Sequence, residues 1–83
     1  MEQIVRTAKQ VGAAIRRRRR AKSLTQTEVG KKTRMRQATV SGLETGEADT
    51  QLRTLFDVLT ALDLEIVIRE RSKASPRDIE DLF

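Results

Sequence analysis

The side chains best suited to chemistry lie between residues 24 and 46, where small and hydrogen-bonding residues share one face of an expected helix. That helix, predicted from about 37 to 45, carries Gln37, Ala38 and Ser41 opposite its apolar side. A glutamine amide can hold adenine by two hydrogen bonds, and small neighbours permit close approach to base edges. Arg36 directly precedes the helix, within reach of a guanine or a phosphate. We therefore predict that Arg36, Gln37, Ala38 and Ser41 read bases; the alternative is an ordinary polar surface helix.

Two short helices joined by a turn must position this face. The first is predicted to begin at Thr25, because Thr25 and Glu28 have the spacing of a capping box, and to end near Thr33. Arg34 and Met35 form the turn, with Met35 as its apolar plug. Gly46 is predicted to end the second helix.

Phosphate contacts are expected around these two helices. The positive N-terminal end of the first helix favours a phosphate, which predicts contacts from Thr25 and Gln26, with Thr39 as a further candidate. The cations Lys31, Lys32 and Arg34 are also phosphate candidates, and plain solubility is the alternative for these three.

An earlier helix, predicted from Thr7 to Lys22, has an apolar stripe and then five consecutive arginines, Arg16 to Arg20. At about 100° per residue these arginines surround the helix, so they cannot all face one partner. A solvated charged surface is the simpler interpretation for most of them. RNA binding is disfavoured because the chain has only two aromatic residues, and membrane binding because the helix lacks a bulky apolar face. Duplex DNA fits better.

The second half of the chain contains a different pair of elements. A helix is predicted to begin with Asp49 or Thr50 as its N-cap and to run to about Leu62. Its apolar positions have helical spacing and are expected to lie in the core: Leu52, Leu55, Phe56, Leu59 and Leu62.

Residues 64–71 then alternate in hydrophobicity and are rich in β-branched side chains, which predicts a strand. Nothing else in the chain has a strand pattern, so this strand would leave its backbone groups unpaired. Pairing with the same strand of a second copy, through Leu64, Ile66, Val67 and Ile68, would satisfy them in a homodimer with a two-fold axis. Such a dimer predicts a palindromic operator. The alternative is a segment packed within its own chain.

The stretch LTQTEV followed by RQATVSGLETG resembles the lambda-repressor-like (XRE) helix-turn-helix family, and most closely its HipB-type antitoxins. The RQATVS segment, the LDLEIVIRE strand and the SKASP tail with its apolar end carry the second likeness. The resemblance implies a partly buried ion pair between Arg19 and Glu44. It also implies a left-handed backbone at Arg34, where the family usually has glycine, so that Arg34 carries some strain or the turn is built differently. It also implies a HipA-like kinase toxin as partner, contacted by the C-terminal residues Leu82 and Phe83. A frayed C-terminus is the simpler interpretation of that tail.

Composition limits the other possibilities. The 83 residues include no cysteine and no histidine, which removes disulfides, a thiol nucleophile and the usual proton shuttle. We therefore expect no enzyme activity, no metal and no cofactor, and a cytoplasmic protein that associates with the bacterial nucleoid when bound to its operator. Residues 1–46 hold 12 lysines and arginines against 3 acidic residues, whereas residues 47–83 hold 5 against 9. The basic half suits a polyanion.

The sequence thus predicts a mainly α fold of four to five helices with one C-terminal strand. Residues 1–63 are expected to form the helix-turn-helix domain, 64–71 the dimerisation strand and 72–83 a flexible tail. The predicted function is a sequence-specific DNA-binding antitoxin that represses its own operon and neutralises a HipA-like kinase. The alternative is a stand-alone repressor of the same family, with no toxin partner.

Overall fold

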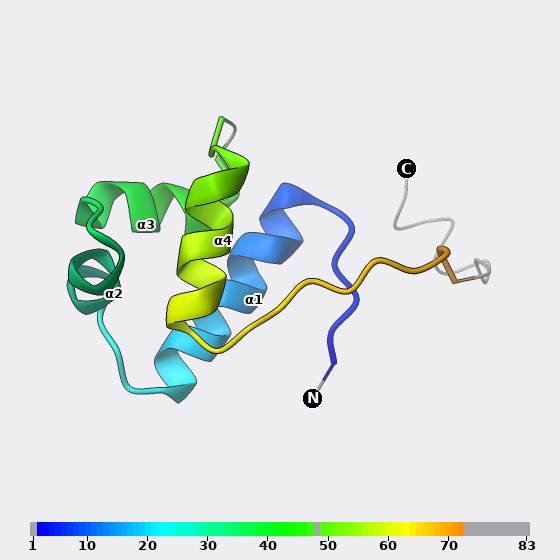
Figure 1. Ribbon diagram of the computed structural model, residues 1–83, viewed down its shortest axis with the longest axis horizontal. Helices are drawn as coiled ribbons and strands as arrows, with labels where there is room; N and C mark the ends of the chain where they lie inside the picture. Colours follow the sequence, from blue (N-terminus) through cyan, green and yellow to red (C-terminus); the bar gives the residue numbers. More distant parts are fainter. Residues whose placement is uncertain (1, 48, 73–83) are drawn as a thin grey trace.

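The computed structural model describes residues 2–47 and 49–72, and the ordered elements in these ranges are four helices (Figure 1). Their bounds are α1 Ala8–Ala21, α2 Gln26–Thr33, α3 Gln37–Thr45 and α4 Leu52–Ala61. Helix α1 passes behind α4 in this view, while α2 and α3 are joined by a short turn at one end of the molecule (Figure 1). The prediction of a mainly α fold is confirmed.

Helix ends are set by local capping. The Thr7 hydroxyl accepts a hydrogen bond from the Gln10 amide at the start of α1, and α2 begins with the predicted capping box. Helix α3 ends at Gly46, whose backbone is left-handed with φ of 75°. Arg34 closes α2 in the same left-handed conformation with φ of 56°, so the expected non-glycine strain at this turn is present.

The core lies where the four helices meet. Its fully or nearly buried apolar residues are Ile15, Val29, Val40, Leu43, Val58, Leu59 and Leu62. Met35 packs against this cluster from the turn, as predicted. The predicted core face of α4 is partly wrong, because Leu52 and Phe56 remain 66% and 46% exposed, while Val58 is buried in their place. Rotation of α4 toward Val58 leaves an apolar strip on its outer side.

Close backbone contact holds α1 against α3. A Cβ atom added to Gly12 of α1 would lie 2.6 Å from the carbonyl oxygen of Glu44, much closer than an ordinary contact. At the other end of this contact, a Cβ on Gly46 would lie 2.5 Å from the Cα of Lys9. The two glycines therefore let α3 lie directly on α1.

Two polar contacts tie α1 to the end of α4. The Arg18 Nε donates a hydrogen bond of 2.9 Å to the Leu62 carbonyl oxygen, so this guanidinium caps the end of α4. Lys22 Nζ lies 2.6 Å from a carboxylate oxygen of Asp63. These contacts fix the point from which residues 64–72 leave the body.

Two expectations for the second half differ from the structure. Helix α4 begins at Leu52 with Gln51 as its N-cap, later than the predicted Asp49 or Thr50, and no side chain caps it. Residues 64–72 form no strand in the single described chain. A strand requires backbone bonds to a neighbour, and the described part of one chain offers this segment no ladder. The dimerisation strand, Leu64, Ile66, Val67 and Ile68, therefore stays a prediction.

No helix within the described ranges has both the length and the apolar character needed to cross a membrane.

Candidate nucleic-acid interface

The outer face of α3 presents the predicted base-reading residues. Arg36, Gln37 and Ala38 are exposed, and Ser41 is half-buried on the flank of α3 that faces α2. Val40, Leu43 and Glu44 occupy the opposite, buried face. The first turn of α3 therefore exposes small and amide side chains, and few bulky groups there would prevent a partner from approaching closely.

The N-terminus of α2 lies beside the first residue of α3. Gln37 Nε2 donates a hydrogen bond to Gln26 Oε1, and Gln26 Nε2 donates to Glu44 Oε1 at 3.1 Å. The Thr25 hydroxyl accepts the backbone amide of Glu28 at 3.1 Å. The structure thus brings together Gln37 and two of the predicted phosphate contacts, Thr25 and Gln26, from two different helices.

A buried ion pair anchors this arrangement. Arg19 Nε and Nη2 donate to the two carboxylate oxygens of Glu44, at 2.6 Å and 2.9 Å, and Arg19 Nη1 donates to the Leu24 carbonyl at 2.8 Å. Both side chains are buried, and the pair is bidentate. Burial raises the pKa of Glu44, but hydrogen bonds from Arg19 and Gln26 outweigh it and hold the pKa below its usual range.

The hydrogen-bond directions leave Gln37 equipped for adenine. Glu44 is an acceptor only, so Gln26 must present its amide nitrogen to Glu44 and its oxygen to Gln37. Gln37 then keeps its own Oε1 and its second Nε2 hydrogen for a ligand. One acceptor and one donor side by side match the N6 and N7 edge of adenine.

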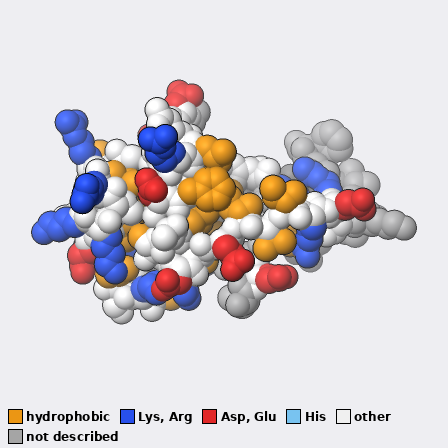
Figure 2. All heavy atoms as spheres, viewed as in Figure 1, with side chains coloured by type: hydrophobic (Ala, Val, Ile, Leu, Met, Phe, Trp, Pro, Cys, Tyr) orange, Lys and Arg blue, Asp and Glu red, His pale blue; other side chains and the backbone are white. Residues whose placement is uncertain are grey.

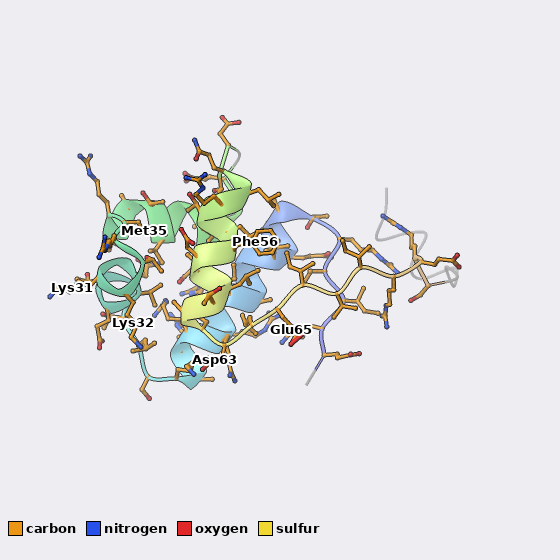
Figure 3. All side chains as sticks on the ribbon, in the orientation of Figure 1. Lys31, Lys32, Met35, Phe56, Asp63 and Glu65 are labelled. Atoms are coloured by element: carbon orange, nitrogen blue, oxygen red, sulfur yellow. The ribbon has the colours of Figure 1, made fainter. Side chains whose placement is uncertain are left out.

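The cations of α2 lie elsewhere. Lys32 and Arg34 line a shallow groove between α2 and α4 that also includes Asp57 and Thr60, away from Gln26 and Gln37. Lys31 projects from α2 beside Lys32 at the outer end of the molecule (Figure 3). The structure therefore does not place Lys31, Lys32 and Arg34 next to the other predicted phosphate contacts, Thr25 and Gln26.

Thr39 lines a second groove, between the outer side of α3 and the start of α4. Its lining residues are Ala38, Thr39, Gly42, Glu47, Asp49, Thr50, Gln51 and Thr54. The hydroxyl and amide groups of Thr50, Gln51 and Thr54 were not singled out from the sequence as part of a site. Two carboxylates share this groove and oppose close approach of a phosphate to Thr39.

The remaining predicted residues lie outside the helical body. Ile66, Val67 and Ile68 are exposed, and Leu64 packs partly against the core. The predicted toxin-contact residues Leu82 and Phe83 lie outside the described residues.

The fold and the exposed helix α3 define a helix-turn-helix protein, and the helix-turn-helix family model HTH_3 matches residues 15–68. Two relatives named antitoxin HipB, from Escherichia coli strains K12 and O6:H1, are each 34% identical over 71 residues. The match covers 86% of this chain and 81% and 76% of those relatives. The chain belongs to the HipB-type antitoxins of the helix-turn-helix family.

Solved structures agree with this placement. A chain of the HipB-O4 20mer complex is 30% identical, with a TM-score of 0.79, over 86% of this chain and 100% of that chain. A chain of the HipA-HipB-O2-O3 complex gives the same identity, TM-score and coverage. The resemblance to HipB therefore extends through the four helices.

Proposed function

We propose that this protein is a DNA-binding antitoxin that recognises a palindromic operator as a homodimer, represses its own operon and neutralises a HipA-like kinase toxin. Family membership supports the general role. The relatives' complexes with HipA and with 20mer duplexes support the two kinds of partner.

One observation carries the DNA-binding part, namely that Gln37 is exposed at the start of α3 while its amide is oriented through Gln26 by the buried Glu44. We place α3 in the major groove, with Gln37 on adenine, Arg36 on guanine, and Ala38 and Ser41 lining the same base edges. An amide held before the duplex arrives loses little freedom on binding, which favours selectivity.

We assign the phosphate contacts to residues that lie beside the base-reading face of α3. Thr25 and Gln26 contact one phosphate with the help of the α2 dipole. Thr39 is a weaker candidate for a second phosphate, because Glu47 and Asp49 share its groove. Lys31, Lys32 and Arg34 add attraction for the duplex from the far end of α2, where exposed cations raise affinity for all sequences alike.

The homodimer is supported by exposed apolar side chains. Val67 and Ile68 are 66% and 94% exposed, and Leu52 and Phe56 of α4 are exposed as well. Figure 2 shows hydrophobic atoms gathered over α4 and continuing toward the segment that follows it. We propose that residues 64–71 of two copies pair as antiparallel strands, covering this surface and placing two α3 helices on one face. Residues 1–63 then form the DNA-binding domain.

The base assignment is tested by selecting duplexes from a randomised pool and measuring binding of variants to the winner. Gln37→Ala is expected to lose about 1–3 kcal/mol of binding and to relax preference at one base pair of each half-site. Lys31→Ala is the control and should weaken all sequences equally. Unchanged preference in Gln37→Ala would contradict the placement of α3.

The toxin assignment is tested by purifying the tagged protein from its native host at moderate salt. Co-purification of a kinase supports an antitoxin. Recovery of a DNA-binding homodimer with no kinase supports a stand-alone repressor instead. Deletion of residues 77–83 is expected to weaken kinase capture while leaving duplex binding intact, since this part of the tail holds the proposed toxin contacts Leu82 and Phe83. Equal capture by the shortened chain would remove the role given to Leu82 and Phe83.

A further inference from the structure

The five consecutive arginines of α1 have different surroundings. Arg17 donates to the Gln3 side chain, Arg18 to the end of α4 and Arg19 to Glu44. Arg16 and Arg20 are exposed and form no side-chain hydrogen bond or ion pair with the described part of the chain. Within residues 2–47 and 49–72, three of the five therefore have polar side-chain contacts, and two have none.

The two remaining arginines lie on one flank of α1. At about 100° per residue, Arg16, Arg20 and the exposed Lys9 fall within a stripe roughly 40° wide. Gly12 and Arg19 lie on the side of α1 that faces α3, and the stripe is about 70° around the helix from them. Arg18, which contacts the end of α4, lies on the other side of α1 from the stripe. We call Lys9, Arg16 and Arg20 the α1 basic row.

The α1 basic row lies beside the C-terminal end of α3 and approaches the start of α2. At one end, the backbone of Lys9 touches Gly46 at the end of α3. In the middle, the positive charge of Arg16 is near enough to help lower the pKa of Glu44. At the other end, Arg20 follows Arg19, whose guanidinium reaches the Leu24 carbonyl just before α2 begins. The row thus runs from the end of α3 to the start of α2.

We propose that the α1 basic row binds the phosphates of a DNA strand beside the groove occupied by α3, making α1 a third DNA-contacting helix. This inference rests on the DNA-binding role proposed above and extends it to residues outside the helix-turn-helix. The row is about 16 Å long at 1.5 Å per residue, and one strand carries a phosphate every 3.4 Å or so of axis. A row of this length spans roughly five phosphates of one strand, so three flexible cations can each contact a phosphate of the same backbone.

Duplex DNA suits this row better than RNA or a membrane surface. No aromatic side chain on α1 offers a stacking platform for unpaired bases. The residues between the cations are small or polar, so the row lacks the apolar face that an interfacial helix needs.

The test is the salt dependence of binding to the duplex selected from the randomised pool, roughly 30 base pairs long to include two half-sites. Fluorescence anisotropy between about 50 and 200 mM salt compares the wild type with Arg16→Gln, Arg20→Gln and the double variant. Each substitution should make the slope of log affinity against log salt shallower by about one per lost phosphate contact, while the base preference stays the same.

Arg17→Gln is the matched control, because it removes the same charge from the same helix on a flank that faces the N-terminal segment. Its slope should equal that of the wild type. The proposal is overturned if the double variant keeps the wild-type slope, if Arg17→Gln changes it equally, or if base preference shifts. A wild type that selects no duplex at all refutes the proposed function, and this inference with it. Circular dichroism melting checks that the variants fold.

Discussion

At the residue scale, the main effect of the buried Arg19–Glu44 ion pair is to orient the side-chain amides next to it. Two charges taken out of water gain little net stability, because the desolvation cost offsets their attraction. Glu44, however, also accepts from Gln26, and Gln26 accepts from Gln37. The pair therefore fixes the direction of an amide at the protein surface, two hydrogen bonds away from a buried charge.

The same pair predicts acid sensitivity. Because the pKa of Glu44 is depressed in the folded state, its contribution is complete above the unfolded-state pKa of about 4.3 and is lost as pH falls through the lower folded value. Urea denaturation is expected to show stability decreasing below about pH 4.5.

Glu44→Gln is the control for this acid sensitivity, since a glutamine retains hydrogen-bonding groups without the titrating carboxylate. It should be less stable than the wild type at neutral pH by about 3–5 kcal/mol at most, with a flatter acid slope. An acid slope identical to the wild type would show that other carboxylates, such as the exposed Asp63 with its lowered pKa, determine the acid response.

At the element scale, helix bounds follow the sequence wherever a side chain or glycine caps the helix. Thr7, Thr25 and Gly46 mark their helix ends correctly, because each makes a local hydrogen bond or adopts a left-handed backbone. Helix α4 begins later than predicted. No side chain caps its start, so the sequence there contains no capping residue from which the start could be predicted. The Gln26 to Gln37 contact joins two helices and could not be read from either one alone.

Two glycine-to-alanine substitutions, one at the α1–α3 contact and one away from it, test how closely these helices pack. Gly12→Ala should destabilise the protein by about 1–3 kcal/mol or more, because its Cβ would meet the α3 backbone. Gly42→Ala should stabilise it by about 1 kcal/mol, since the nearest atom is a Glu47 carboxylate oxygen at 3.4 Å and alanine favours a helix. Urea unfolding midpoints compare the two. Equal midpoints would mean that α1 and α3 lie further apart than described here.

At the scale of the whole molecule, one predicted element, the strand over residues 64–71, depends on a second chain. The helices are specified by contacts within about ten residues and by one core, so the sequence predicts them well. Residues 64–71 have a strand pattern, but the backbone partner that makes a strand lies outside the single chain. The excess of cations in the first 46 residues predicts a polyanion partner. It does not show that Arg16 and Arg20, of the five arginines, are the ones left available, because that depends on how α1 packs on α3.

Dimerisation through this segment has a direct test. Ile68, which is 94% exposed, should lie in the interface, so Ile68→Glu is expected to cost about 3–6 kcal/mol per dimer for two side chains. Sedimentation equilibrium should then show monomers of 9.4 kDa at concentrations where the wild type is dimeric. Glu65→Gln is the control on the opposite face of the expected strand and should remain dimeric. A wild type that is already monomeric would refute the paired strands.

The attachment of α1 to the end of α4 determines how freely the two halves of such a dimer can turn. Arg18 and Lys22 hold Leu62 and Asp63 immediately before the segment that would join the copies. In the proposed dimer, these contacts would restrict rotation of one recognition helix relative to the other. Inserting a single base pair at the centre of the operator turns one half-site by about a tenth of a helical turn. A rigid joint cannot follow that turn, so binding should depend strictly on the length of the spacer.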